Sequence, residues 1–167
     1  LYYFYDALIR LQLVITGKQP ASKSVKKIKS AIGKFKKWAK NAPVNFQHKR
    51  DLIQELLEVV RRNTAEAESL VQKSIDGATT NGYTNEVALG NNLFAVYHQV
   101  SGNESQSEKY FKKAHHAYKQ WGAINKVRQL EELHPHLAVS QESMTVTSEM
   151  KSVTAQGIGN KLLDLST

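Results

Sequence analysis

The apolar residues of this chain recur mostly at spacings of three and four, which is the period of an amphipathic α-helix. The clearest example lies between residues 105 and 135, where two such patterns meet at Gly122. Tyr118 and Trp121 share the apolar face of the first pattern, so we expect both rings to be buried against other helices. Gly122 stands where a left-handed residue commonly ends a helix. The second pattern has its apolar positions at Ala123, Val127, Leu130 and Leu133.

The rest of the chain contains five more helical patterns, separated by Gly, Pro and Asn residues that end helices. Ser22 or Ser24 is expected to cap the second helix, and Thr84 the fifth. In the second helix Val25, Ile28, Ile32, Phe35 and Ala39 form a continuous apolar seam. In the first, the expected buried side is Tyr2, Tyr5, Leu8 or Ile9, and Leu13. The seven expected helices cover about residues 1–15, 22–41, 43–62, 65–80, 84–100, 104–121 and 123–133.

Short turns between helices of this length indicate antiparallel neighbours. The third and fourth patterns resemble the fifth and sixth at an offset of 40 residues, which is longer than the roughly 34 residues of a tetratricopeptide repeat. We therefore predict an all-α fold of about seven antiparallel helices in stacked helical hairpins, as in a tetratricopeptide-like solenoid. This domain should cover residues 1–137. A Ser/Thr-rich linker is expected over 138–161, and the start of another element over 162–167.

Composition narrows the class of protein. The 167 residues suffice for one domain with a core, and the absence of cysteine is typical of a cytoplasmic protein. No apolar run reaches the length of a membrane span, so we expect no membrane partner. The chain begins with Leu and not with Met, and we expect it to be part of a longer protein.

The net charge of +8 is concentrated in one region. No acidic residue occurs between Asp6 and Asp51, whereas nine lysines lie between Lys18 and Lys40. Such a run is either an electrostatic site for nucleic acid or anionic lipid, or the solvated face of the second helix. The apolar seam favours the solvated face, which could still attract an acidic partner domain. The residues expected to contact such a partner are Lys26, Lys27, Lys36 and Lys37.

The sequence carries no pattern of an active site. It has no phosphate-binding loop of the GxxxxGK[ST] type and no protein-kinase signature. His134 and His136 flank Pro135 without the further ligands that a zinc site needs. We expect no catalytic residue, no cofactor and no metal. Polar residues of the fifth helix, namely Asn91, Asn92 and His98, either line a concave peptide groove or face solvent.

Four blocks of residues, taken in order, resemble the helical region of very large multidomain signalling proteins. The blocks are FYDAL at 4–8, NAPVNFQHK at 41–49, NGYTNEVALGNNLFAVY at 81–97 and AHHAYKQWGAINKVRQLEELHP at 114–135. Proteins of that kind occur in bacteria and, as hybrid histidine kinases, in fungi. They carry a Ser/Thr-kinase-like domain and an AAA-type ATPase module before the helical region, and a GAF domain and a histidine kinase after it.

The resemblance implies a non-catalytic scaffold or coupling segment of a multisensor histidine kinase in a phosphorelay. Its partners would be the ATPase module and the GAF and kinase domains of the same chain. The WGA block ends the helical region in that family, so Tyr118, Trp121, Gly122, Val127 and Leu130 are expected to be structural. One alternative is a separate tetratricopeptide-like adaptor that binds peptides. Another, which the apolar seam disfavours, is a basic nucleic-acid-binding domain.

Overall fold

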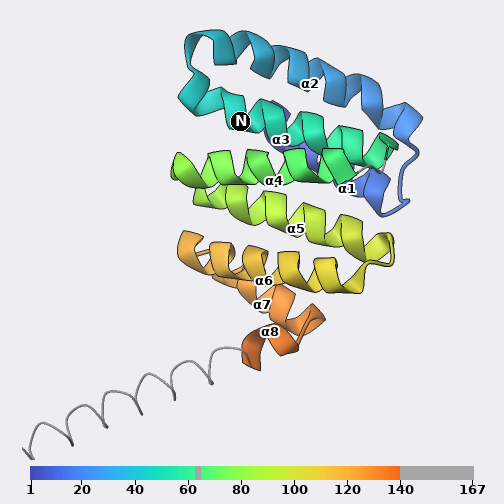
Figure 1. The fold of residues 1–167 in the computed structure, drawn as a ribbon, viewed down its shortest axis with the longest axis vertical. Coiled ribbons are helices and arrows are strands. Elements are labelled where there is room, and N and C mark those ends of the chain that lie inside the picture. Colours follow the sequence, from blue (N-terminus) through green and yellow to red (C-terminus); the bar gives the residue numbers. More distant parts are fainter. Residues whose placement is uncertain (63–64, 140–167) are drawn as a thin grey trace, which may run out of the picture. The chain divides into compact units, whose positions relative to one another are not determined.

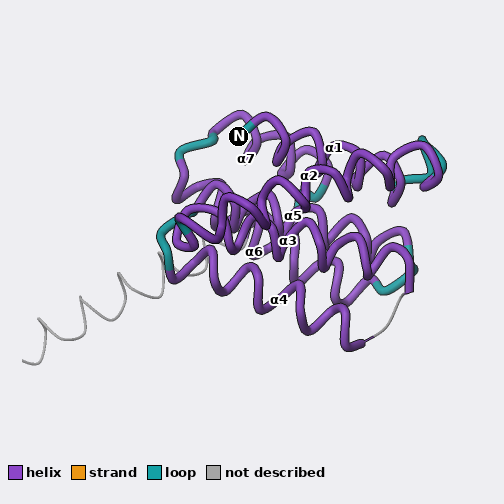
Figure 2. Tube along the Cα trace, turned by 90° about the horizontal axis from the view of Figure 1, so that it is seen from above, coloured by secondary structure: helices purple, strands orange, loops and turns teal. Residues whose placement is uncertain are grey.

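The described part of the chain consists of helices joined by short loops (Figure 2). A computed structural model describes the backbone of residues 1–62 and 65–139, and their side chains apart from 62–68 and 139. The predicted linker beyond residue 139 and the segment 162–167 lie outside these residues. The all-α prediction is confirmed. The helices are α1 (Tyr2–Ile15), α2 (Ala21–Asn41), α3 (Pro43–Arg62), α4 (Ala65–Thr80), α5 (Thr84–Val100), α6 (Glu104–Trp121), α7 (Ile124–Leu133) and α8 (His136–Val139).

The first six helices form three hairpins in a stack, and they belong to a compact unit that spans Leu1–Val127. Figure 1 shows their axes lying side by side from α2 to α6. The odd-numbered helices α1, α3 and α5 all contact one another. Among the even-numbered helices, α2 contacts α1 and α3, α4 contacts α3 and α5, and α6 contacts α5, so α2 and α4 each bridge two hairpins. This is the contact pattern of a helical-repeat stack with α1, α3 and α5 as its inner helices.

Glycines with positive φ follow the last residues of α4 and α6 and end these helices. Gly122 adopts φ 77° and ψ 19°, and the N–H of Ala123 donates to the carbonyl of Tyr118 at 2.9 Å. Gly82 has φ 75°, and the N–H of Tyr83 after it donates to the carbonyl of Ala78 in α4 at 3.0 Å. These are Schellman motifs, which use a left-handed residue to satisfy the last carbonyls of a helix. The predicted ends at Gly122 and at Asn81–Gly82 are confirmed.

The core follows the predicted seam in α2 but not in α1. Ile28, Phe35 and Ala39 are buried, together with Ala31 in place of Ile32. In α1 the buried residues are Phe4, Ala7, Leu8, Leu11 and Ile15, whereas Tyr2 is 73% exposed and Ile9 58%. Of the expected face of α1, Leu8 is buried and Tyr5 and Leu13 are half-buried, whereas Tyr2 lies on the exposed side. The helix is apolar on nearly every side, so periodicity alone could not identify the side that packs.

The predicted helix caps are wrong. Neither Ser22 nor Ser24 caps α2, because the cap position is Pro20 and no side chain bonds to the first turn. Thr84 does not cap α5, because the cap position there is Tyr83.

The predicted burial of Trp121 is also wrong. Trp121 is 46% exposed, although Tyr118 beside it is only 1% exposed. Trp121 is the last residue of α6 and stacks on Tyr118, with ring centroids 6.2 Å apart. The antiparallel partner α5 begins only at Thr84, so it provides no further turn to cover the indole.

The second compact unit begins at Arg128, so α7 crosses the boundary between the two units. Within the described part of this unit, Leu130 and Leu137 are buried. α7 ends before Pro135, and the chain then forms the single turn of α8, where the sequence pattern predicts no helix. Leu137 closes this turn, because its N–H donates to the carbonyl of His134 at 2.9 Å.

A glycine at the centre of the stack allows three helices to approach closely. A Cβ at Gly90 of α5 would lie 3.1 Å from Ile75 of α4 and 3.3 Å from Leu52 of α3. Both of these neighbours are buried, so they cannot move aside freely. Gly33 in the middle of α2 provides a contrast, because a Cβ there would have no atom within 4 Å.

We predict that Gly33→Ala raises the free energy of unfolding by about 0.5–1 kcal/mol, because Gly is the poorer helix former. Gly90→Ala has the same helical advantage but overpacks the core, which costs about 1–3 kcal/mol. In urea denaturation, Gly90→Ala should therefore be less stable than Gly33→Ala by about 1–3 kcal/mol. Equal stability of the two variants would show that the three helices do not meet at Gly90.

Burial of Tyr118 predicts a loss of stability at high pH. Desolvation raises the pKa of this phenol from 10 to about 12. The folded state favours the protonated phenol, so this contribution is complete below pH 10 and disappears as the pH rises from 10 to 12. Its slope is at most about 1.4 kcal/mol per pH unit. Urea unfolding of the parent and of Tyr118→Phe between pH 9 and 12 should show a steeper loss for the parent. Parallel curves would contradict the burial.

Candidate functional site

The most unusual chemical feature of the described residues is a cluster of charges buried between α3 and α5. Glu86 lies in the first turn of α5 and is only 2% exposed. His48 Nε2 lies 2.6 Å from its Oε2, and Lys49 Nζ lies 2.6 Å from its Oε1. Both of these α3 side chains are buried as well. Each oxygen of the carboxylate thus faces one group of the opposite helix.

His48 Nε2 lies close to polar atoms of both partners. It is 2.6 Å from Glu86 Oε2 and 3.1 Å from Lys49 Nζ. Lys49 pairs with Glu86 Oε1 and donates, at 2.9 Å, to the carbonyl oxygen of Asn45. His48 Nδ1 and Glu86 Oε2 meet no partner with hydrogen-bond geometry among the described residues.

Tyr83 covers the cluster from the turn between α4 and α5. Its ring stacks on His48 with centroids 4.3 Å apart, and Lys49 Nζ lies 4.2 Å from the ring centroid. Its hydroxyl donates to Asn45 Oδ1 at 2.7 Å. The start of α3 is thus tied to the start of α5 by an ion pair, a ring stack and a cation–π contact. Because the charges are covered and face each other, this arrangement joins the two helices.

No local pattern in the sequence predicts this cluster. Lys49 belongs to the basic region, and Glu86 in a first helical turn is explained by the helix dipole alone. Both patterns are typical of exposed positions. Yet the residues lie in two of the four blocks that carry the family resemblance, at 41–49 and at 81–97. Those blocks, far apart in sequence, meet in the folded chain.

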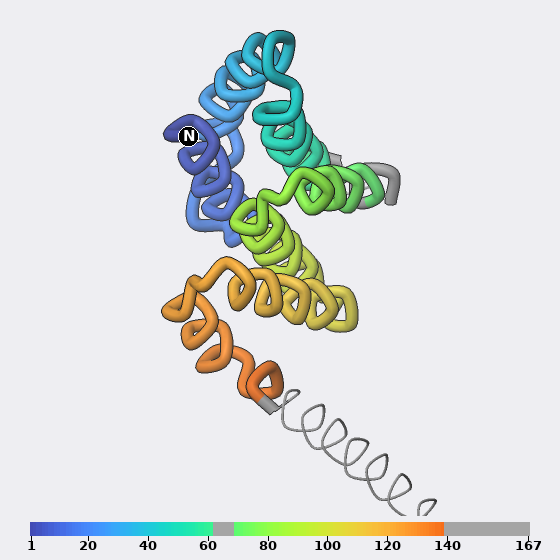
Figure 3. Tube along the Cα trace, turned by 90° about the vertical axis from the view of Figure 1, so that its left-hand side faces the viewer, coloured from blue at the N-terminus to red at the C-terminus, as the bar shows by residue number. Residues whose placement is uncertain are grey.

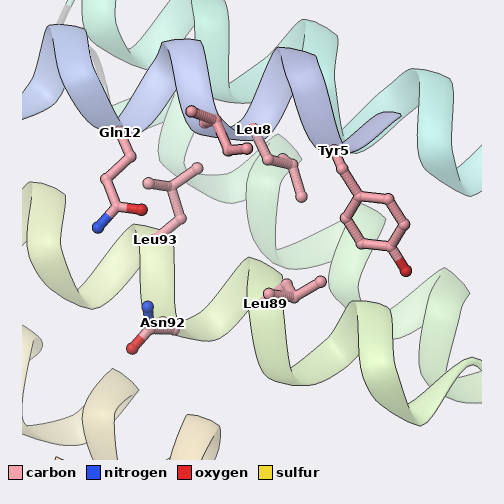
Figure 4. Close-up of a pocket in the computed structure, with 7 residues that line it drawn as sticks. Tyr5, Leu8, Gln12, Leu89, Asn92 and Leu93 are labelled. Atoms are coloured by element: carbon pink, nitrogen blue, oxygen red, sulfur yellow. The ribbon is translucent and has the colours of Figure 1, made fainter. Parts of the chain in front are cut away.

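Little space remains between the inner helices α1 and α5. α1 contacts α5 directly, and Asn85 Nδ2 donates to the Tyr5 hydroxyl at 3.5 Å. Between these helices lies a small cleft of about 100 Å³, in which Gln12 and Asn92 lie at one end and Tyr5 at the other (Figure 4). Of the three polar residues predicted to line a concave groove, Asn92 alone lines this cleft. Its lining residues are Tyr5, Leu8, Ile9, Gln12, Leu89, Asn92 and Leu93.

The other two of these polar residues are buried. His98 is 2% exposed and stacks on Tyr110 of α6, with ring centroids 5.5 Å apart. Asn91 is also 2% exposed, and its Nδ2 donates to the carbonyl of Val87 at 2.8 Å. A partner could not reach His98 without opening the contact between α5 and α6. In the described structure, Asn91, Asn92 and His98 do not form one binding surface.

A larger groove of about 340 Å³ runs along α4, α5 and α6. Gln72 of α4 joins two of these helices, because its Oε1 accepts from Tyr110 and Lys113 of α6 at 3.1 Å each. Partial burial, with Lys109 nearby, lowers the pKa of Lys113 from its ordinary value. The groove has apolar and polar walls, and Asn91 lies against it. Its lining residues are Gln72, Ile75, Asp76, Thr79, Val87, Asn91, Lys113, His116, Ala117 and Gln120.

The lysines selected from the sequence are on the surface. Lys26, Lys27, Lys36 and Lys37 are all exposed on α2. Of the expected structural residues, Tyr118, Val127 and Leu130 are buried, and Gly122 ends α6. Over residues 1–62 and 65–139, no three His, Cys, Asp or Glu side chains are grouped so that they could hold a metal ion. In the same ranges, no helix is both long and apolar enough to cross a bilayer.

A scan against protein families, a search of curated proteins and a search of solved structures each find no match to this chain.

We predict that Glu86→Gln lowers the free energy of unfolding by about 3–5 kcal/mol, because Lys49 then remains charged and buried without a counterion. Replacing both residues, as Glu86→Gln with Lys49→Met, should restore much of this loss. The control is Glu108→Gln, which breaks a half-exposed pair with Lys112 and should cost at most about 1 kcal/mol. Additive effects of the two cluster substitutions in urea would contradict the buried pairing.

Proposed function

We propose that this chain is a non-catalytic helical scaffold that couples neighbouring domains in a multisensor histidine kinase. The observation that supports this proposal most directly is that the blocks at 41–49 and 81–97 meet at the Glu86 cluster. These blocks underlie the resemblance, and their polar residues hold two helices together instead of lining an open site. Such a distribution supports a segment whose role depends on its shape. The neighbouring ATPase, GAF and kinase domains are inferred from the resemblance alone.

A stack of packed hairpins suits this role physically. Each hairpin contacts the next through its inner helix, and α5 also contacts α1. A rotation of one hairpin would therefore strain Gly90 and the Glu86 cluster, which join different helices. A rigid connection of this kind can transmit a displacement between domains at its two ends. The proposed phosphorelay function places the scaffold in the cytoplasm, where ATP is available.

A second candidate function is a peptide-binding adaptor. The groove along α4, α5 and α6 favours it, because binding sites commonly combine apolar lining with a few polar groups, and this groove has both. The narrow cleft between α1 and α5 argues against the usual concave site. The third candidate function is nucleic-acid binding. Trp38, the exposed aromatic residue of α2, argues against it, because its ring already packs on Phe35 and Phe46, at centroid distances of 5.2 and 5.6 Å.

The test begins with the reading frame on both sides of the chain. We expect it to encode an ATPase module before the helices and GAF and histidine-kinase domains after them. In that full-length protein, labelled ATP should phosphorylate a histidine outside residues 1–167. Glu86→Gln should change the rate of this autophosphorylation, and Glu108→Gln should leave it unaltered.

The alternative outcomes are distinct. A reading frame that ends with the helical region would exclude the coupling function and favour the adaptor. Phosphorylation at the same rate in the parent and in Glu86→Gln, with the variant shown to be looser by urea unfolding, would contradict mechanical coupling through this segment.

A further inference from the structure

The outer face of α2 carries the largest uncompensated charge in the described structure. Lysines at positions 23, 26, 27, 29, 36, 37 and 40 are exposed, and Lys34 is half-buried with its Nζ 4.6 Å from the Tyr3 ring centroid. Over the described residues, none of these eight lysines forms an ion pair with a carboxylate. Like charges three or four positions apart destabilise a helix. No carboxylate of the described residues relieves this repulsion, so an anionic partner would stabilise the helix.

The lysines surround an open strip on the helix surface. At 100° per residue they cover about half of the circumference, opposite the buried Ile28 and Phe35. Two rows run along the edges of this arc, one with Lys23, Lys27 and Lys34, the other with Lys29, Lys36 and Lys40. The crest between them carries Ser30 and Gly33, with Lys26 and Lys37 at its two ends. A Cβ added at Gly33 would meet no atom within 4 Å, so the crest is low and accessible.

The position of α2 leaves this face open within its unit. The helix lies at the edge of the stack and contacts α1 and α3 (Figures 1 and 3). Its 21 residues give a ridge of about 30 Å. An extended peptide rises about 3.3 Å per residue, so five or six residues cover the distance from Lys26 to Lys37.

We propose that the crest of α2 binds an extended acidic segment of a protein, rich in Asp or Glu, with lysines on both of its sides. A bound backbone can approach closely over Ser30 and Gly33, while the long lysine side chains reach carboxylates from either row. Compact ammonium groups on flexible stems suit irregularly spaced carboxylates.

Two other polyanions fit the same face less well. Arginine is the residue of choice for nucleic-acid recognition, and the chain has no arginine between Arg10 and Arg50. Single strands require exposed aromatic faces, but Trp38 packs on three other rings. A lipid surface is nearly flat and would touch only the crest of the arc. The helix also has no apolar side free for insertion, since Ile28, Ala31 and Phe35 are in the core.

The test measures binding to this chain by fluorescence anisotropy at about 150 mM salt, where exposed charges are screened beyond about 8 Å. The probe is a labelled peptide of eight alternating Asp and Glu residues. Its Asn/Gln counterpart, a 20-base-pair duplex and vesicles with one-fifth phosphatidylserine serve as comparisons. We expect the acidic peptide to bind more tightly than any of these three.

Three variants test where on the chain the peptide binds. Reversing Lys26, Lys27, Lys36 and Lys37 to Glu should weaken binding by about tenfold or more, since each contributes a separate charge contact. Reversing Lys73, Lys109, Lys112 and Lys119 makes the same change in net charge elsewhere and should weaken it less than about threefold, because only long-range attraction is lost. Gly33→Leu fills the crest without changing charge and should also weaken binding.

Equal effects of the two reversal sets would overturn the proposal, as would unaltered binding in Gly33→Leu. Tighter binding to the duplex or to the vesicles would assign the face to those partners instead. The inference does not depend on the coupling function, because it is measured on this chain without its parent. Failure of autophosphorylation in the full-length protein and failure of peptide binding here are therefore separate results.

Discussion

The junction between α3 and α5 depends on one buried carboxylate. Glu86 is removed from water, and an isolated charge in that position would cost several kcal/mol. The cost is offset because Lys49 and His48 approach its two oxygens and Tyr83 covers them. Each of these contacts is possible only when the two helices meet at one register. The cluster therefore specifies how the hairpins stack, more than it adds to the total stability.

The close approach of the inner helices determines which surfaces remain open. Gly90 lets α5 lie directly against α3 and α4, and α1 then contacts α5. Between α1 and α5 the described structure consequently has a small cleft, whereas a helical repeat with wider spacing would present a groove there. Two other accessible features are the groove along α4, α5 and α6 and the lysine-covered face of α2.

This arrangement also separates the residues that make the fold recognisable from those available to a partner. Tyr83, Glu86 and Gly90 lie within one of the resemblance blocks, and all of them serve contacts between helices. The lysines of α2 all lie outside the blocks. The residues behind the proposed resemblance thus serve contacts between helices, and the charged surface lies on an outer helix.

The sequence by itself determined the number of main helices and most of their ends. Helical period, proline and glycine act over a few neighbouring residues, which is why Pro43–Arg62 and Glu104–Trp121 agree with the structure at both ends. Local pattern also showed the core side of α2, because its polar side is uniformly charged.

Only the tertiary structure decided the rest. The packed side of α1, the exposure of Trp121 and the pairing of Glu86 with His48 and Lys49 depend on where neighbouring helices begin and end. A carboxylate in a first helical turn and a lysine in a helix have the same local pattern whether they are solvated or buried together. Burial is a property of contacts between distant segments, and for this chain those contacts placed the predicted groove residues Asn91 and His98 inside the stack.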